Sequence, residues 1–205
     1  MHPEALTEQG EKLFPEFKEF DGFYLAGGTG LALQVGHRIS EDFDFFTENY
    51  LSDNLLGSVE EVFKHQEVSP AVNNSEELTV FIDETKITFL RYPFELINRL
   101  KVYRGVSIMK VGEIAATKAY TVGRRGSFKD YVDLYFCMRK GHTSLIEIID
   151  LAREKYGEKF NARLFLEQLL YLEDIQSTSL RFLGKAVDKN KIKTFFEKEI
   201  SKIDL

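Results

Sequence analysis

The chain has 205 residues, a formal net charge of −6, a pI near 5.4 and a single cysteine. The acidic balance argues against a broad nucleic-acid-coating surface, so we expect no DNA partner, although a local basic groove is still allowed. One cysteine excludes an internal disulfide framework, and no apolar run has the length of a signal peptide or a membrane span. We therefore expect a cytoplasmic protein with no membrane partner.

The first third of the chain mixes helical and strand patterns. Residues 3–20 show helical spacing of apolar positions, and the short apolar run at 23–26 predicts a buried strand. Thr29 then opens an apolar-periodic segment that ends at Gly36, which predicts a helix with a threonine N-cap and a C-terminal glycine. Ser52 begins a further amphipathic segment, for which we predict a helix to about residue 65.

From residue 67 the apolar period drops to two, which predicts β-strands. The expected strands span residues 67–72, 78–83 and 85–92, with a tight turn at Asp83–Glu84 and one more short strand near 106–109.

From residue 111 to the end the pattern is helical. The expected helices span residues 111–125, 128–140 after an N-cap at Ser127, 143–156, 162–172 and 191–203. The order of elements predicts an α/β (α+β) fold in two parts. Residues 1–109 would form an α/β domain with a mixed sheet, and residues 110–205 a C-terminal helical domain.

Two features between residues 27 and 44 point to phosphate and metal chemistry. Gly27, Gly28 and Thr29 stand at a strand-to-helix turn, where free backbone amides favour an anion, although the segment is neither a Walker A loop nor G-x-G-x-x-G. Asp42 and Asp44 lie two apart in an apolar strand pattern and therefore share a face. Such a pair suits Mg²⁺, and the alternative is an exposed strand face.

The helices after residue 111 carry a second polar group. Lys118 lies on the first helix, and Lys129, Asp130 and Asp133 lie on the second. Asp130 and Asp133 are three residues apart and share a helix face. The lysine could reach a triphosphate, or it could form a structural ion pair with one of these acids.

Taken together, GGTGLALQVGHRISEDFDFF resembles the first motif of the nucleotidyltransferase superfamily, and more narrowly the AbiEii/AbiGii-type toxin family. That family's G-G-T, G-H-R and D-F-D-F-F elements occur here in the same order. EIAATKAY followed by RRGSFKDYVDLYF is similar to the family's lysine helix and to its R-G-x-x-K-D-x-x-D-L-Y helix. The resemblance runs from about residue 23 to residue 136.

The resemblance implies a nucleotidyltransferase-type sheet with flanking helices and an active site between the two domains. Asp42 and Asp44 would hold Mg²⁺ or Mn²⁺, and Lys118 would bind the triphosphate of an NTP. The other residues implied in nucleotide binding are Gly27, Gly28, Thr29, Arg38, Ser40, Lys129 and Asp133. The implied acceptor is RNA, tRNA 3′ ends in some members, and the implied protein partner is a separately encoded antitoxin.

The sequence departs from the superfamily at one catalytic position. Many nucleotidyltransferases carry a third carboxylate on a later strand, and the matching residue here is Thr88. Either the general base comes from the helical half, with Asp130 as the candidate, or one metal ion suffices, or transfer is weak. Two competing readings therefore remain: a catalytically degenerate protein that binds a nucleotide or a partner, and a transferase that modifies protein.

Overall fold

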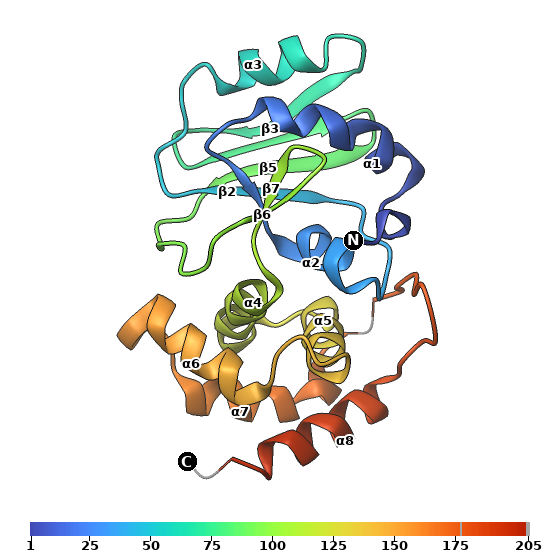
Figure 1. Cartoon of the computed structure of the whole chain (residues 1–205), viewed down its shortest axis with the longest axis vertical. Helices are drawn as coiled ribbons and strands as arrows, with labels where there is room; N and C mark the ends of the chain where they lie inside the picture. Colours follow the sequence, from blue (N-terminus) through green and yellow to red (C-terminus); the bar gives the residue numbers. More distant parts are fainter. Residues whose placement is uncertain (177, 204–205) are drawn as a thin grey trace.

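The computed structural model describes residues 1–176 and 178–203, and within them the strands form one seven-stranded mixed sheet in the order β3-β4-β5-β2-β1-β7-β6. Figure 1 shows this sheet between two groups of helices. The strands are β1 (Tyr24–Leu25), β2 (Phe43–Thr47), β3 (Val68–Asn73), β4 (Glu77–Ile82), β5 (Thr85–Arg91), β6 (Lys101–Tyr103) and β7 (Val106–Ile108). The predicted α/β fold class is confirmed.

The position of β2 at the centre of the sheet determines which face the side chains of Asp42 and Asp44 point to. β2 runs antiparallel to β1 and parallel to β5. Phe43 and Phe45 are 1% exposed, and both rings lie with centroids 4.8 Å from the ring of Phe17 in the N-terminal region. Because neighbouring side chains on a strand point to opposite faces, Asp44 and the preceding Asp42 face the other side of the sheet.

Short helices cover the phenylalanine face. They are α1 (Glu8–Leu13), the 3₁₀ turns Pro3–Ala5 and Phe14–Glu19, and α3 (Leu55–Val62). α3 begins after Asn54, three residues later than the sequence predicted, while the turn at Asp83–Glu84 is confirmed. The core that these helices close is rich in aromatic rings, which explains the abundance of phenylalanine in this half.

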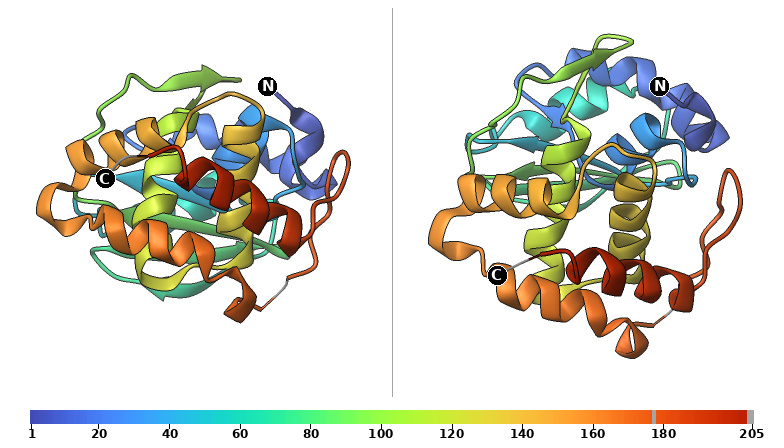
Figure 2. Two further views of the ribbon diagram at one scale, coloured as in Figure 1. Left: turned by 90° about the horizontal axis from the view of Figure 1, so that it is seen from below. Right: turned by 60° about the horizontal axis from the view of Figure 1, so that its bottom comes forward.

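The opposite face meets the helical half of the chain. Its helices are α4 (Val111–Arg125), α5 (Phe128–Arg139), α6 (Leu145–Tyr156), α7 (Ala162–Leu170) and α8 (Lys189–Ile200), with 3₁₀ turns at Gly157–Lys159 and Leu172–Asp174. α4 and α5 lie next to the sheet layer, and α7 and α8 pack outside them (Figure 2). Across the described residues, no helix has both the length and the apolar content needed to cross a bilayer.

Helix α2 (Gly27–Val35) joins the two halves. Leu33 belongs to the hydrophobic cluster of the sheet, while Leu31 and Val35 belong to the cluster of the helical half. One helix therefore packs into two cores, and it fixes the position of its N-terminus relative to both. The division into domains at residues 109 and 110 stays a prediction.

The predicted N-cap of α2 is wrong, whereas the strand predicted near residues 106–109 is confirmed as β7. α2 begins at Gly27 with Ala26 as its N-cap, so Thr29 lies inside the first turn. The reason is the backbone of Gly27, whose φ of +57° lets the helix begin three residues earlier than predicted. The strand near residue 106 has a partner, β6, that the sequence did not indicate. Arg104 and Gly105, with φ of 50° and 85°, form the tight turn between them.

Candidate active site

A cavity of about 230 Å³ opens where α2, β2, α4 and α5 meet. From the first motif, its wall includes Gly27, Gly28, Arg38, Ser40, Asp42 and Asp44. From the helical half, it includes Lys118, Lys129 and Asp130. The structure thus brings two sequence blocks about eighty residues apart to one site. Two of the predicted site residues, Thr29 and Asp133, do not lie on the cavity wall.

The N-terminus of α2 faces this cavity with free backbone amides. The first hydrogen bond of the helix runs from the Gly30 amide to the Ala26 carbonyl, so the amides of Gly27 and Gly28 have no intrahelical acceptor. A side chain at Gly27 would overlap Oδ2 of Asp44 and lie 3.0 Å from its Cβ and Cγ. Glycine is therefore needed here both for its positive φ and for the approach of Asp44.

The carboxylates of Asp42 and Asp44 are open to a cation. Asp42 is exposed and Asp44 is partly exposed, and no hydrogen bond reaches either carboxylate from residues 1–176 or 178–203. Burial, and then the neighbouring charge of Asp42, raise the pKa of Asp44 above its ordinary value. Two carboxylates with spare oxygens fit Mg²⁺, which completes its shell with phosphate oxygens and water. Within the described part of the chain, no group of three or more histidine, cysteine, aspartate or glutamate side chains is placed to hold a metal ion.

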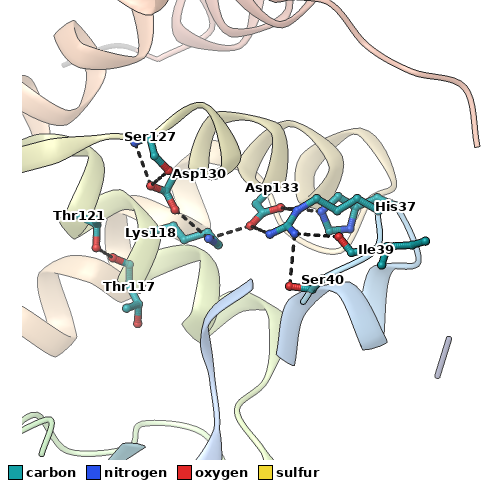
Figure 3. A network of polar contacts seen from close by, with 10 residues as sticks. His37, Ile39, Ser40, Thr117, Lys118, Thr121, Ser127, Asp130 and Asp133 are labelled. Carbon is teal, nitrogen blue, oxygen red and sulfur yellow. Dashed lines mark hydrogen bonds and ion pairs between the residues drawn. The ribbon is translucent and has the colours of Figure 1, made fainter. Parts of the chain in front are cut away.

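Asp133 is the centre of a buried ionic network at the back of the cavity (Figure 3). Its carboxylate is fully buried and accepts hydrogen bonds from Arg38 Nε at 2.8 Å, Arg38 Nη2 at 3.0 Å and His37 Nε2 at 2.7 Å. Lys118 Nζ lies 2.7 Å from Oδ2 of the same carboxylate. Burial alone would raise the pKa of Asp133, but Arg38 and Lys118 hold it well below its ordinary value. Asp133 therefore positions the two cations and does not itself face a ligand.

Lys118 links this network to Asp130. Its Nζ lies 2.9 Å from Asp130 Oδ1, and the two carboxylates keep the lysine protonated despite its burial by raising its pKa. Asp130 Oδ2 accepts from both the amide and the hydroxyl of Ser127, so Asp130 also caps α5. These donors lower the pKa of Asp130 against the effect of burial. A carboxylate held in this way is a weak proton acceptor, which argues against Asp130 as the general base.

His37 is a buried neutral partner of Asp133. Burial lowers the pKa of the imidazole, and its Nδ1 has no hydrogen-bond partner in the described structure. We assign the Nε2–H tautomer, because Asp133 can only accept a hydrogen bond. The histidine therefore orients the carboxylate that positions Arg38.

Thr29 holds the other wall of the site in place. Its side chain is 1% exposed, and its hydroxyl donates to the backbone carbonyl of Asp42. The hydroxyl thus ties α2 to the residue before β2. Because the hydroxyl is occupied, only the backbone amide of Thr29 is available to contact a phosphate.

The loop at residues 37–41 is held from both ends of the chain. On one side the Ser40 amide donates to the Ala5 carbonyl. On the other side the Ile39 amide donates to Arg181 and the Leu183 amide donates to His37, so residues 181–183 add a short bridge beside Arg38. The position of Arg38 therefore depends on segments about 35 residues before it and 140 residues after it in the sequence.

Lys129 is the cation on the cavity wall that forms no salt bridge within the described residues, although its charge acts on Asp44. It is partly exposed, whereas Arg38 and Lys118 are both committed to Asp133. A free ammonium beside the amides of α2 suits the β- and γ-phosphates of a nucleotide.

Lys129→Gln is therefore expected to weaken NTP binding about tenfold or more, because a hydrogen bond to a charged group contributes about 1.5–3 kcal/mol. The free energy of unfolding should change by less than about 0.5 kcal/mol. Calorimetric titration with NTP and Mg²⁺ measures the first quantity. The matched control is Lys64→Gln, just after the end of α3, which removes the same charge from an exposed ion pair with Glu61. Equal affinity in the two variants would contradict this role.

A second, larger hollow of about 610 Å³ lies on the other side of Asp42. Its remaining wall is Thr7, Gln9, Glu41, Asp83, Glu84 and Thr85. It has four carboxylates and no lysine or arginine on its wall, so it repels a triphosphate. The smaller cavity is therefore the candidate active site.

Some wall residues of the cavity were not predicted from the sequence. They are Phe46, Thr117, Thr121 and Ser127. Thr121 stands three residues after Lys118 on α4 and so shares its helix face, a signal that could have identified it. Phe46 follows Asp44 by two residues on β2, and period-two alternation places it on the same face.

Comparisons with known proteins agree on the family of this chain. The family described as "Nucleotidyl transferase AbiEii toxin, Type IV TA system" matches residues 11–105. An uncharacterized protein of Aquifex aeolicus (strain VF5), aq_aa25, is 34% identical over 154 residues, which are 74% of each chain.

Solved structures show the same fold. The crystal structure of a candidate nucleotidyltransferase from H. pylori has a TM-score of 0.62 at 20% identity over 96% of each chain. JHP933 from Helicobacter pylori has a TM-score of 0.53 at 18% identity, over 96% of this chain and 97% of that one. These structures show the fold, and the family match over residues 11–105 together with the 34% identity to the Aquifex aeolicus protein shows that the chain belongs to the AbiEii nucleotidyltransferase toxin family.

Proposed function

We propose that this protein transfers a nucleoside monophosphate from an NTP to RNA in a Mg²⁺-dependent reaction, and that a separately encoded antitoxin is its partner. The observation that carries the proposal is one cavity with three complementary features. These are the carboxylates of Asp42 and Asp44, the free amides at the start of α2, and the cation of Lys129. The family description supports the antitoxin as a partner.

In the proposed reaction, an acceptor hydroxyl oxygen bonds to the α-phosphorus and the bond from that phosphorus to the pyrophosphate breaks. The amides of Gly27 and Gly28 and the ammonium of Lys129 bind the charge of the leaving pyrophosphate. Arg38 and Lys118, held by Asp133, place two further positive charges at the back of the site. Mg²⁺ or Mn²⁺, held by Asp42 and Asp44, supplies charge neutralisation across the phosphates.

An open strip of sheet beside the cavity supports RNA as the acceptor. Phe81 on β4 and Lys86 on β5 pair directly across the two strands, and both are exposed. They share the sheet face of Thr88, which lies next to Asp44. An aromatic ring for base stacking beside a cation for the backbone is a combination that single-stranded RNA sites use.

The test combines nucleotide binding with transfer. Asp42→Ala and Asp44→Ala should each abolish Mg²⁺-dependent binding of GTP, ATP, CTP or UTP in a calorimeter, while the protein stays folded. Transfer of α-³²P label to total RNA should fall by about 10²-fold or more, because electrostatic stabilisation of the reacting phosphates is lost. Glu41→Ala, which removes the adjacent exposed carboxylate, is the matched control.

The same labelling experiment separates the alternatives. Label on protein instead of RNA would identify a protein-modifying transferase. Nucleotide binding without label on any macromolecule would identify a degenerate binding protein, which Thr88 in place of a third carboxylate favours. No heat with any of the four nucleotides would reject nucleotide binding altogether.

A further inference from the structure

Three polar side chains form a line that begins beside Asp44 and crosses the sheet. Thr88 on β5 is in register with Asp44 on the parallel neighbour β2. Thr79 on β4 is in register with Thr88, and their Oγ1 atoms are 3.3 Å apart. Glu77, two residues before Thr79 on the same face, accepts from the Thr79 hydroxyl at 2.7 Å. The line therefore runs from the metal-binding strand to a carboxylate two strands away.

Counting protons fixes the direction of these hydrogen bonds. A threonine hydroxyl has one proton, and Thr79 gives its proton to the Glu77 carboxylate, which can only accept. The hydrogen bond between the two threonines must then be donated by Thr88. This leaves the lone pairs of Thr88 Oγ1 able to accept a further hydrogen bond, at a position in register with Asp44 on the neighbouring strand.

The surroundings favour proton movement along this line. Thr79 is 4% exposed and Thr88 is 8% exposed, so bulk water has little access to the two hydroxyls. Glu77 is partly exposed and forms no ion pair with a lysine, arginine or histidine of the described chain. This contrasts with Asp130, whose carboxylate is held by Lys118 and by the amide and hydroxyl of Ser127.

We propose that Thr88, Thr79 and Glu77 form a proton relay that replaces the third carboxylate of the nucleotidyltransferase site. As the acceptor oxygen bonds to the α-phosphorus, its proton passes to Thr88 Oγ1. The proton of Thr88 passes to Thr79, and that of Thr79 to the Glu77 carboxylate. One proton leaves the acceptor and one arrives on Glu77, so atoms and charge balance. The relay rests on the proposed transferase function.

Breaking the relay at Glu77 or at Thr79 should slow transfer without weakening nucleotide binding. Glu77→Gln and Thr79→Val are each expected to lower the transfer rate about 10²-fold, the lower range for a positioned base. The double variant should be no slower than either single one, because both act on one path. Thr79→Ser, which keeps the hydroxyl, should retain activity. Calorimetry with NTP and Mg²⁺ should give wild-type affinity for every variant.

Two further measurements separate a relay from a structural role. Thr88→Asp in the Thr79→Val background places a carboxylate next to Asp44 and should restore transfer. The acidic limb of the pH–rate profile of this double variant should then report the ionisation of the introduced carboxylate. Repacking of the strand would not produce that change. Glu76→Gln and Thr85→Val are matched controls for the loss of a carboxylate and of a buried strand hydroxyl, and both should transfer at the wild-type rate.

The outcomes distinguish the relay from the function on which it rests. If the wild-type protein transfers label and Glu77→Gln and Thr79→Val transfer it equally fast, the relay is rejected while the proposed function stands. Additive losses in the double variant, or no rescue by Thr88→Asp, would likewise count against the relay. If the wild-type protein labels no macromolecule, the proposed function fails and the relay fails with it.

Discussion

Asp133→Asn is expected to lower the free energy of unfolding by about 3–5 kcal/mol, a large share of the stability of a domain. The substitution leaves the buried cations of Arg38 and Lys118 without their shared carboxylate. An amide oxygen cannot replace four hydrogen-bonding contacts to two carboxylate oxygens, and its NH₂ group faces donors. Urea unfolding followed by circular dichroism at pH 7 measures the change. Transfer activity should fall as well, because both cations lose the group that positions them.

The pH dependence of stability gives an independent check of the same residue. The pKa of Asp133 is well below its ordinary value of 3.8 in the folded protein, so its contribution to stability is complete above about pH 5. The contribution is lost as the pH falls further toward the folded-state pKa. The stability curves of the wild type and of Asp133→Asn should therefore run parallel above about pH 5 and converge below pH 4.

The matched control for Asp133 is Asp150→Asn on α6. Asp150 forms an exposed ion pair with Arg153 at 3.7 Å, a type that contributes at most about 1 kcal/mol. A loss in Asp133→Asn as small as in this control would show that the buried network does not stabilise the fold.

Gly27→Ala is expected to reduce nucleotidyl transfer by about 10²-fold or more. The added methyl group would overlap Oδ2 of Asp44, and the carboxylate must rotate away from the cavity to make room. A displacement of about 1 Å at a reacting group is enough for a loss of this size. The left-handed backbone adds a stability cost of roughly 1–2 kcal/mol. Initial rates of label transfer, with calorimetry for Mg²⁺-dependent NTP binding, measure the effect.

Gly22→Ala separates the backbone strain from the contact with Asp44. Gly22 also has a positive φ, +82°, but a methyl group there would meet no atom within 4 Å. It should lose stability as Gly27→Ala does and retain the transfer rate. Equal activity in the two variants would mean that the approach of Gly27 to Asp44 has no catalytic consequence.

Residues in short motifs were placed well by sequence reasoning. Period-two alternation was enough to put Asp42 and Asp44 on one face, because Phe43 and Phe45 mark the opposite, buried side. The family resemblance added Lys118 and Lys129 from two distant helices, a placement that no local pattern contains. Together these residues line one cavity.

Side-chain direction within a helix was harder to predict. The two residues that do not reach the cavity wall, Thr29 and Asp133, belong to motifs whose other members do. The start of α2 depends on the backbone of Gly27, so the helix begins three residues earlier than predicted and Thr29 lies inside its first turn, where its hydroxyl bonds the Asp42 carbonyl. Asp133 shares a face with Asp130, yet one helical turn carries it from the cavity rim to the buried interface with Arg38.

The bridge between residues 181–183 and the loop of Arg38 has a consequence for the timing of synthesis. A ribosome releases the chain from its N-terminus, so Arg38 emerges long before Arg181, whose carbonyl accepts from the Ile39 amide. A nascent chain that already displays Asp42 and Asp44 still lacks the last support of its arginine loop. The candidate site is therefore complete only after residues 181–183 have been translated and have joined the loop of Arg38.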